Sequence, residues 1–173
     1  MSQTPEAAPK REDITLRAAT DADYDFMRLL YHSTREEEMK HFPFDDERKV
    51  TFLDQQFAAQ TEHYGIHYPT ARKQIIEFRG APVGRLYVDE WPQQIRIVDI
   101  ALMPEMRGAG VGSFLLRDVL DEGAAKGKRV TIHVEAFNPA LRLYDRLGFR
   151  QVDTNGIYYL MEWKVPEPEA SAT

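Results

Sequence analysis

Residues 98–120 read VDIALMPEMRGAGVGSFLLRDVL, and three glycines stand at alternate positions between two apolar stretches. These are Gly108, Gly110 and Gly112. Glycine inside a helix costs roughly 1 kcal/mol relative to alanine, so these residues are typical of a turn. The residues before them read as a finished strand, and those after them have the spacing of a helix. The segment therefore predicts a strand, a glycine turn and a helix, in that order.

The helix after the turn has one continuous apolar stripe. At spacings of three and four residues the stripe contains Gly112, Leu115, Leu116, Val119, Leu120 and Gly123. We expect this helix to pack on a sheet, with Gly112 facing it because the missing side chain permits close approach. A glycine-rich turn that leads into a helix N-terminus offers converging N–H groups and the positive end of the helix dipole. The predicted ligand therefore carries phosphate.

Two familiar phosphate loops do not fit this turn. A Walker loop ends in Gly-Lys-Ser/Thr, whereas Ser113 and Phe114 follow the last glycine here. The dinucleotide fingerprint is G-x-G-x-x-G, whereas this turn reads G-x-G-x-G and comes late in the chain, without a second mononucleotide half.

The composition of the whole chain narrows the function further. The 173 residues fit one domain, and the net charge of -6 with scattered basic residues argues against a nucleic-acid partner. No cysteine is present, which excludes a thiolate metal site and a cysteine nucleophile and suits a reducing cytoplasm. No apolar run has the length of a secretion signal or a membrane span. We expect a cytoplasmic protein with no membrane partner.

Strand-like and helix-like segments alternate along the chain, which favours an α/β or α+β fold. Strands are expected at residues 14–20, 71–80, 81–91, 94–103 and 129–136, with a last pair that ends near residue 163. Helices are expected at residues 22–32, with Thr20 as the N-cap, and at 45–64, with Val50, Leu53 and Phe57 on one apolar face. Two more are expected from Gly112 onward and at 139–147, where Tyr144 belongs to an inward apolar stripe and Gly148 ends the helix. Residues 1–13 and 166–173 lack periodicity and are interpreted as flexible tails on a domain at 14–165.

The glycine turn resembles the pyrophosphate loop of the GNAT superfamily of N-acetyltransferases. The family motif, Arg/Gln-x-x-Gly-x-Gly/Ala, is matched by Arg107, Gly110 and Gly112. A second block, NPALRLYDRLGF at residues 138–149, is similar to the family's Asn…Leu-Tyr…Gly-Phe segment. The resemblance implies a single domain with a mixed sheet of about six to seven strands, splayed central parallel strands and about four helices.

The resemblance also implies how acetyl-CoA would be held. Backbone groups of Leu102 and Met103 would pair with the pantetheine arm, and Asn138 and Tyr144 would lie near the thioester. Tyr144 is then the candidate acid that protonates the departing thiolate. The N–H groups that would hold the pyrophosphate belong to Arg107, Gly108, Ala109, Gly110, Val111, Gly112 and Ser113. No metal is implied.

A proton acceptor is needed as well, because only a free amine has the lone pair that attacks a thioester. Thr131, His133 and Glu135 alternate along one face of their strand, which suggests a wet cleft. The reference pKa of histidine, about 6.5, suits His133 to the task. In N-terminal-protein acetyltransferases of this family a glutamate stands at that position, five residues before the motif asparagine. Asp99 is a second candidate, either to orient His133 or to act through a water.

The expected activity is transfer of acetyl from acetyl-CoA to a primary amine in a ternary complex. The other base position of the family, eleven residues before the motif arginine, holds Arg96, which argues against histone-type catalysis. The acceptor stays open among a small amine, an amino acid, an antibiotic and a protein N-terminus, and the molecule is a monomer or a homodimer. The alternatives are an inactive module that binds CoA as a sensor or interaction partner, and a nucleotide-binding regulator.

Overall fold

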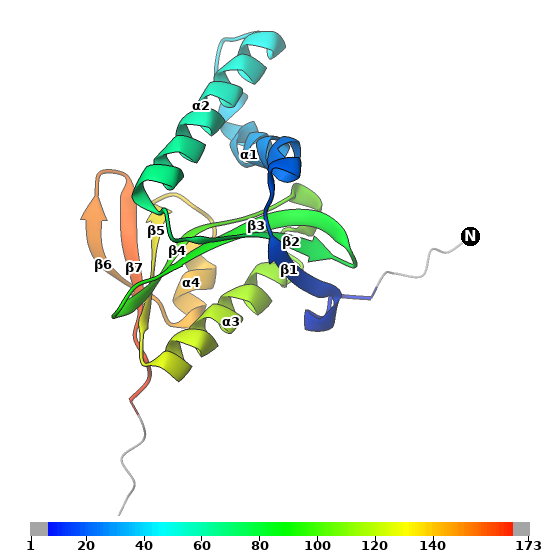
Figure 1. The fold of residues 1–173 in the computed structure, drawn as a ribbon. Coiled ribbons are helices and arrows are strands. Elements are labelled where there is room, and N and C mark those ends of the chain that lie inside the picture. The colour runs from blue at the N-terminus through cyan, green and yellow to red at the C-terminus, as the bar shows by residue number, and fades with distance from the viewer. Residues whose placement is uncertain (1–6, 168–173) are drawn as a thin grey trace, which may run out of the picture. The chain divides into compact units, whose positions relative to one another are not determined.

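Seven strands form one mixed sheet in the order β1-β2-β3-β4-β5-β7-β6 in the computed structural model, which describes residues 7–167 (Figure 1). The strands are β1 (Ile14–Ala18), β2 (Arg72–Phe78), β3 (Ala81–Glu90), β4 (Gln94–Leu102), β5 (Arg129–Glu135), β6 (Arg150–Asn155) and β7 (Tyr158–Trp163). The α-helices among the described residues are α1 (Tyr24–Met39), α2 (Asp46–His67), α3 (Val111–Lys126) and α4 (Leu141–Leu147). The expected single α/β domain, with its mixed sheet and four helices, is confirmed.

Strands β4 and β5 form the parallel pair that the sequence places at the centre of the sheet. Their register matches Gln94 with Arg129 and runs to Ile97, which lies opposite Ile132. Both strands continue past this register, β4 to Leu102 and β5 to Glu135. Strand β5 pairs antiparallel with β7 on its other side, so the sheet is mixed at this point.

The chain divides into two compact units. The first contains the residues up to Tyr87 together with Asp99–Gly112, and the second contains Val88–Val98 and the residues from Ser113 onward. Strands β3 and β4 each contribute residues to both.

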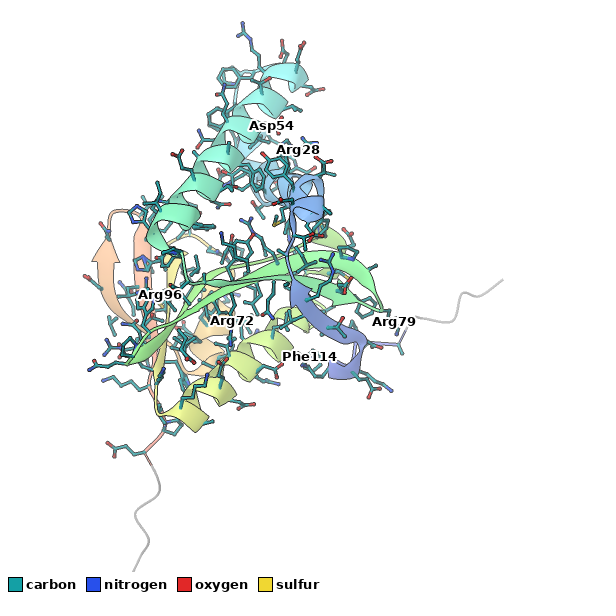
Figure 2. All side chains as sticks on the ribbon, in the orientation of Figure 1. Arg28, Asp54, Arg72, Arg79, Arg96 and Phe114 are labelled. Atoms are coloured by element: carbon teal, nitrogen blue, oxygen red, sulfur yellow. The ribbon has the colours of Figure 1, made fainter. Side chains whose placement is uncertain are left out.

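Helices α1 and α2 of the first unit pack on each other through a small apolar core. Tyr31, Leu53 and Phe57 belong to this core, and the rings of Tyr31 and Phe57 lie 5.7 Å apart. On the outer side Arg28 of α1 donates to the Asp54 carboxylate of α2 at 3.2 Å, and both side chains are labelled in Figure 2. Figure 1 shows both helices on the same face of strands β1, β2 and β3.

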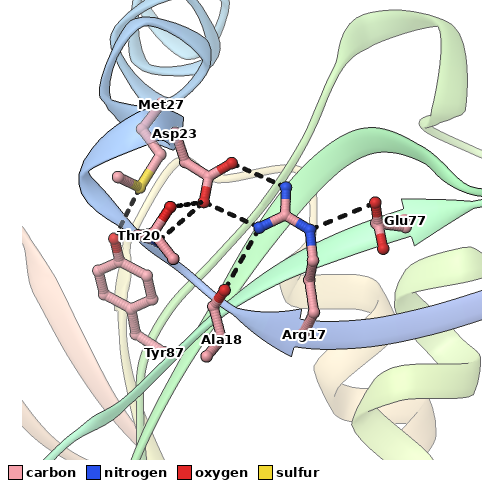
Figure 3. A network of polar contacts seen from close by, with 7 residues as sticks. All are labelled: Arg17, Ala18, Thr20, Asp23, Met27, Glu77 and Tyr87. Carbon is pink, nitrogen blue, oxygen red and sulfur yellow. Dashed lines mark hydrogen bonds and ion pairs between the residues drawn. The ribbon is translucent and has the colours of Figure 1, made fainter.

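The start of α1 is fastened to the sheet by a guanidinium. Arg17 of β1 forms two hydrogen bonds to the buried carboxylate of Asp23, at 2.7 and 2.9 Å, and an ion pair with Glu77 of β2 (Figure 3). The hydrogen bond from Arg17, with a second from the Thr20 amide, lowers the pKa of Asp23 to about 2. Thr20 lies where the sequence predicts an N-cap, although the first turn, Asp21–Asp23, is a 3₁₀ turn.

In the second unit α3 lies against strands β5 and β7. A Cβ atom at Gly123 would lie 2.9 Å from Val130 and 3.5 Å from Trp163, so the helix comes close to the sheet where its apolar stripe ends in glycine. The stripe residues Leu115 and Leu116 are fully buried, as their spacing predicts. Helix α4 ends at Gly148, whose φ of 100° is the left-handed conformation that the sequence predicts for a helix stop.

Several local predictions differ from the structure. Helix α1 extends to Met39 instead of ending at residue 32, because contacts such as the burial of Met39 against α2 stabilise its second half. Val50, which the spacing places on the buried face of α2, is 47% exposed, since the packed part of that face begins at Leu53. Helix α4 begins at Leu141 rather than at Pro139.

The tails remain largely a prediction. Residues 1–6 and 168–173, which belong to the expected tails, lie outside the described residues. Within the described part, Arg11–Asp13 form a 3₁₀ turn directly before β1. The Asp13 carbonyl accepts a hydrogen bond from the Arg79 amide at 2.8 Å, which ties this turn to the β2–β3 hairpin.

Gly84 of β3 has no space for a side chain. A Cβ atom there would collide with the backbone oxygen of Ala101 and lie 2.9 Å from Leu102. Because a backbone oxygen cannot turn aside, we expect Gly84→Ala to lower the free energy of unfolding by about 1–3 kcal/mol, measured by urea denaturation. Gly65→Ala on α2 is the matched control, since nothing lies within 4 Å of that position. It should leave stability unchanged or raise it by up to about 1 kcal/mol. Equal effects of the two substitutions would contradict the close approach.

Candidate functional site

The glycine turn has the backbone geometry that the sequence requires. After β4, a 3₁₀ turn at Pro104–Met106 leads to Gly108 with φ 74° and Gly110 with φ 91°, both left-handed. Helix α3 then begins at Val111. The N–H groups of its first turn have no acceptor within the helix, and they lie at the positive end of its dipole. Two left-handed residues at this place explain why glycine is needed, because other residues adopt this conformation at a cost.

Arg107 is the exposed side chain of this turn. Its Nε donates to the Leu102 carbonyl at 3.0 Å, and a terminal nitrogen donates to the Ser33 hydroxyl of α1 at 3.3 Å. The motif arginine thus links the turn to β4 and to the middle of α1.

Backbone groups of Leu102 and Met103 already form hydrogen bonds within the protein. The Met103 amide donates to the Val83 carbonyl at 2.8 Å, and the Leu102 carbonyl accepts from Arg107. A Cβ atom at Gly112 would lie 4.0 Å from the Leu102 side chain and meet nothing closer, so the close approach expected at this glycine is not present. Of the residues expected to hold the donor, Leu102 to Gly112 form one continuous segment of the first unit, whereas Ser113 is counted with the second.

Asn138 and Tyr144 belong to the second unit. The Asn138 side-chain oxygen accepts from the Ala140 amide at 2.9 Å and its carbonyl accepts from the Leu141 amide, so Asn138 caps the turn that opens α4. Tyr144 points inward, as its place in the stripe predicts. Its side chain is 5% exposed and its ring meets that of Phe149 edge-on at 5.6 Å.

On strand β5, His133 stands between the buried residues Ile132 and Val134, and only part of the polar face of the strand is exposed. His133 is exposed, whereas Thr131 is 2% exposed. The Thr131 hydroxyl donates to Gln94 at 2.7 Å and accepts from Arg96 Nε at 2.8 Å, so its polarity is satisfied inside the protein. The pKa of His133 is nevertheless lowered, because its imidazole is partly desolvated and because Arg96 brings a positive charge near it.

Asp99 lies in a polar cluster of the first unit that the sequence analysis did not find. Its carboxylate forms an ion pair with Arg85 of β3, which is 3% exposed, and accepts from the Tyr64 hydroxyl at 3.3 Å. Arg85 also donates to Gln60 of α2 at 2.5 Å. The one available signal was an arginine in the middle of an otherwise apolar strand, GRLYV. Burial and the nearby Asp99 raise the pKa of Tyr64, so its phenol stays protonated.

A family comparison matches residues 28–149 to the acetyltransferase (GNAT) family. The match covers most of the chain and includes the glycine turn and the block at 138–149. The chain belongs to this family. Among the described residues of this GNAT protein, no group of three or more His, Asp or Glu side chains is placed to hold a metal ion.

Solved structures share the fold at low sequence identity. The PaiA N-acetyltransferase from Thermoplasma acidophilum, in complex with coenzyme A, has a TM-score of 0.67 and 15% identity over 87% of this chain and 98% of that chain. The ribosomal-protein-S18-alanine N-acetyltransferase from Escherichia coli has a TM-score of 0.59 and 17% identity over 92% and 99%. These likenesses support the GNAT fold, and sequence identities this low do not allow the substrate of a neighbour to be assigned to this chain.

A curated relative matches a shorter part of this GNAT chain. The cysteine-rich protein 2-binding protein of Mus musculus is 38% identical over 63 residues, 34% of this chain and 8% of that protein. The chain therefore spans a small part of the length of this relative. No helix within residues 7–167 combines the length and the apolar character that crossing a membrane requires.

The pKa of His133 provides a direct test of its surroundings. Replacing Arg96 by glutamine removes a positive charge that disfavours the imidazolium, so we expect the His133 pKa to rise in Arg96→Gln, by up to about one unit. The pKa is measured by NMR titration of the imidazole, which needs no substrate. Arg129→Gln, on the same strand, is the control and should leave the pKa unchanged. An unshifted pKa in Arg96→Gln would remove Arg96 from the electrostatics of His133.

Proposed function

We propose that this GNAT protein transfers the acetyl group of acetyl-CoA directly to a primary amine, within a ternary complex. The observation that carries the proposal is the turn with left-handed Gly108 and Gly110 that runs into α3, in a chain that belongs to an acetyltransferase family. The bound coenzyme A of the Thermoplasma neighbour supports the same choice of donor.

The donor would be held by backbone groups at the end of β4 and in the turn. N–H groups from Arg107 to Ser113 are proposed for the pyrophosphate, with the positive end of the α3 dipole favouring its charge. The Arg107 amide donates to the Pro104 carbonyl at 3.2 Å, so the groups from Gly108 onward would carry this binding. Leu102 and Met103 would pair with the pantetheine arm. The Met103 amide donates to Val83, and the carbonyls of Leu102 and Met103 accept from Arg107 and from the Met106 amide, so each carbonyl would use its second lone pair for this pairing.

The chemistry requires two proton transfers. The amine nitrogen attacks the thioester carbonyl carbon, the new C–N bond forms and the C–S bond breaks. The nitrogen gives up one proton, for which His133 is the proposed acceptor, and the departing thiolate receives one, for which Tyr144 is the proposed donor. A lowered pKa keeps His133 neutral, with a free lone pair, to lower pH than an ordinary histidine. Asp99 is proposed to contribute through its charge. Asn138 is proposed to lie near the thioester of the bound donor and to position it.

The acceptor is an amine of a small molecule, a peptide or a protein. One structural neighbour acts on an alanine of ribosomal protein S18, which supports a peptide amine as one member of this range. We place the protein in the cytoplasm, as a monomer or a homodimer, and the lack of cysteine in the chain is compatible with that compartment.

The central experiment is calorimetric titration with acetyl-CoA, followed by an assay of thiol release with a panel of amines and peptides. We expect binding and turnover. Binding without turnover across the panel would replace the enzyme by a CoA-binding module, and no binding would overturn the assignment of the glycine turn.

The substitution Gly110→Asp tests the turn itself. It places a negative charge and a strained left-handed side chain where the pyrophosphate is proposed to bind, so the affinity for acetyl-CoA should fall more than tenfold. Gly127→Asp is the matched control, since Gly127 also has a positive φ, of 66°, and lies beyond the end of α3. Acetyl-CoA affinity in Gly127→Asp should equal that of the unaltered protein. Retained affinity in Gly110→Asp would disprove the assignment.

For Tyr144→Phe, we expect kcat to fall by roughly 100-fold while the affinity for acetyl-CoA changes less than twofold, because only the proton donor is lost. The ring contact with Phe149 is kept by phenylalanine, which preserves the packing. Tyr158→Phe, at an exposed tyrosine of β7, serves as the control and should leave kcat unchanged. An unaltered kcat in Tyr144→Phe would remove this residue from the chemistry.

A further inference from the structure

A small cavity of about 40 Å³ lies inside the first unit, between helices α1 and α2 and strands β2 and β3. Its walls include Met27, Thr61, Tyr64, Lys73, Arg85 and Tyr87. A single water needs about 10–15 Å³ of such volume, so the cavity has room for a group of a few heavy atoms. None of the residues expected to hold acetyl-CoA lines it.

The two charged side chains that line the cavity are both cations, Lys73 and Arg85. Arg85 is paired with Asp99, and Asp23, whose charge also acts on Tyr87, is paired with Arg17. Within residues 7–167 the Lys73 ammonium has no hydrogen bond or ion pair. This half-buried ammonium is therefore available to pair with a negatively charged ligand.

The guanidinium of Arg85 also lacks an acceptor. Its Nε atom is buried, and no acceptor for it is present within residues 7–167. Buried N–H groups nearly always have a hydrogen-bond partner, because a buried N–H group without a hydrogen bond is energetically costly. The side chain is held from other directions by Asp99, by Gln60 and by the face of the Tyr87 ring, 5.0 Å from the guanidinium carbon.

The phenols at the cavity act as donors rather than as anions. Burial raises the pKa of both Tyr64 and Tyr87, which therefore stay protonated. The Tyr87 hydroxyl donates to the sulfur of Met27 at 3.0 Å, as drawn in Figure 3. Since a thioether is a weak acceptor, an anionic oxygen in the cavity would be a better partner for this hydroxyl.

We propose that this cavity binds a carboxylate of the acceptor, so that the substrates are small amines that also carry a carboxylate, such as amino acids. A carboxylate has the single charge and the two acceptor oxygens that Lys73, Arg85 and Tyr87 require, and its three heavy atoms match the volume. The identity of the amine rests on the proposed acetyl transfer, whereas binding of the anion does not.

The anion site is tested without catalysis, by ligand-observed NMR titration with propionate and with propionamide, its neutral counterpart of the same shape. Propionate should bind at least tenfold more tightly than propionamide. Lys73→Met should weaken propionate binding at least tenfold, while Lys164→Met, at an exposed lysine of the second unit, should leave it unchanged. Equal binding of the two probes, or wild-type affinity in Lys73→Met, would overturn the proposal. Tighter binding of inorganic phosphate than of propionate would overturn the choice of a carboxylate.

Turnover separates this inference from the proposed function. With acetyl-CoA, alanine should be used with at least tenfold higher kcat/KM than ethylamine, and Lys73→Met should remove that preference. Turnover of both amines at equal rates would disprove the carboxylate site and leave the acetyltransferase standing. Propionate binding without turnover of any amine would support the carboxylate site and overturn the proposed acetyl transfer.

Discussion

The buried ion pair of Arg85 and Asp99 is the constraint on which the first unit depends. A guanidinium that is 3% exposed is tolerated only with partners, because an unpaired buried charge is very unfavourable. Removing one partner from such a pair typically costs about 3–5 kcal/mol. The pair joins β3 to β4, and Gln60 and Tyr64 extend it to α2. One side chain in the middle of a strand thus determines where a helix and a neighbouring strand lie.

The sequence predicted the elements whose signals are local. The glycine turn, the apolar stripe of α3 and the stop at Gly148 each depend on residues within a few positions, and all three are confirmed. The Arg85 cluster was missed because Gln60 and Asp99 stand 25 and 14 residues from Arg85, and no spacing rule connects them. The burial of Thr131 was missed for the same reason, since its partners lie on another strand.

The two parts of the candidate site, for the donor and for the acceptor, differ in how far apart their residues stand in the sequence. The segment proposed to hold the donor is continuous, from Leu102 to Ser113, so a short motif describes it and the family match includes it. The cavity proposed for the acceptor draws on two helices and two strands. Two of the solved structures share the fold with this chain at 15 to 17% identity, and a shared fold does not fix the substrate.

The two candidate bases, Asp99 and His133, differ in the hydrogen bonds that they already accept and in their exposure. Both Arg85 and Tyr64 donate to the same oxygen of Asp99, Oδ2, so one of its two carboxylate oxygens is engaged inside the protein. His133 is exposed, and Arg96 disfavours its protonated form. A general base needs an accessible lone pair at the working pH, which favours the imidazole. On this argument we keep His133 as the proposed proton acceptor, and we propose that Asp99 contributes by fixing Arg85 and, through it, the cavity wall. Arg96, at the family's other base position, lowers the pKa of His133 through its charge and so favours the neutral imidazole that this proposal requires.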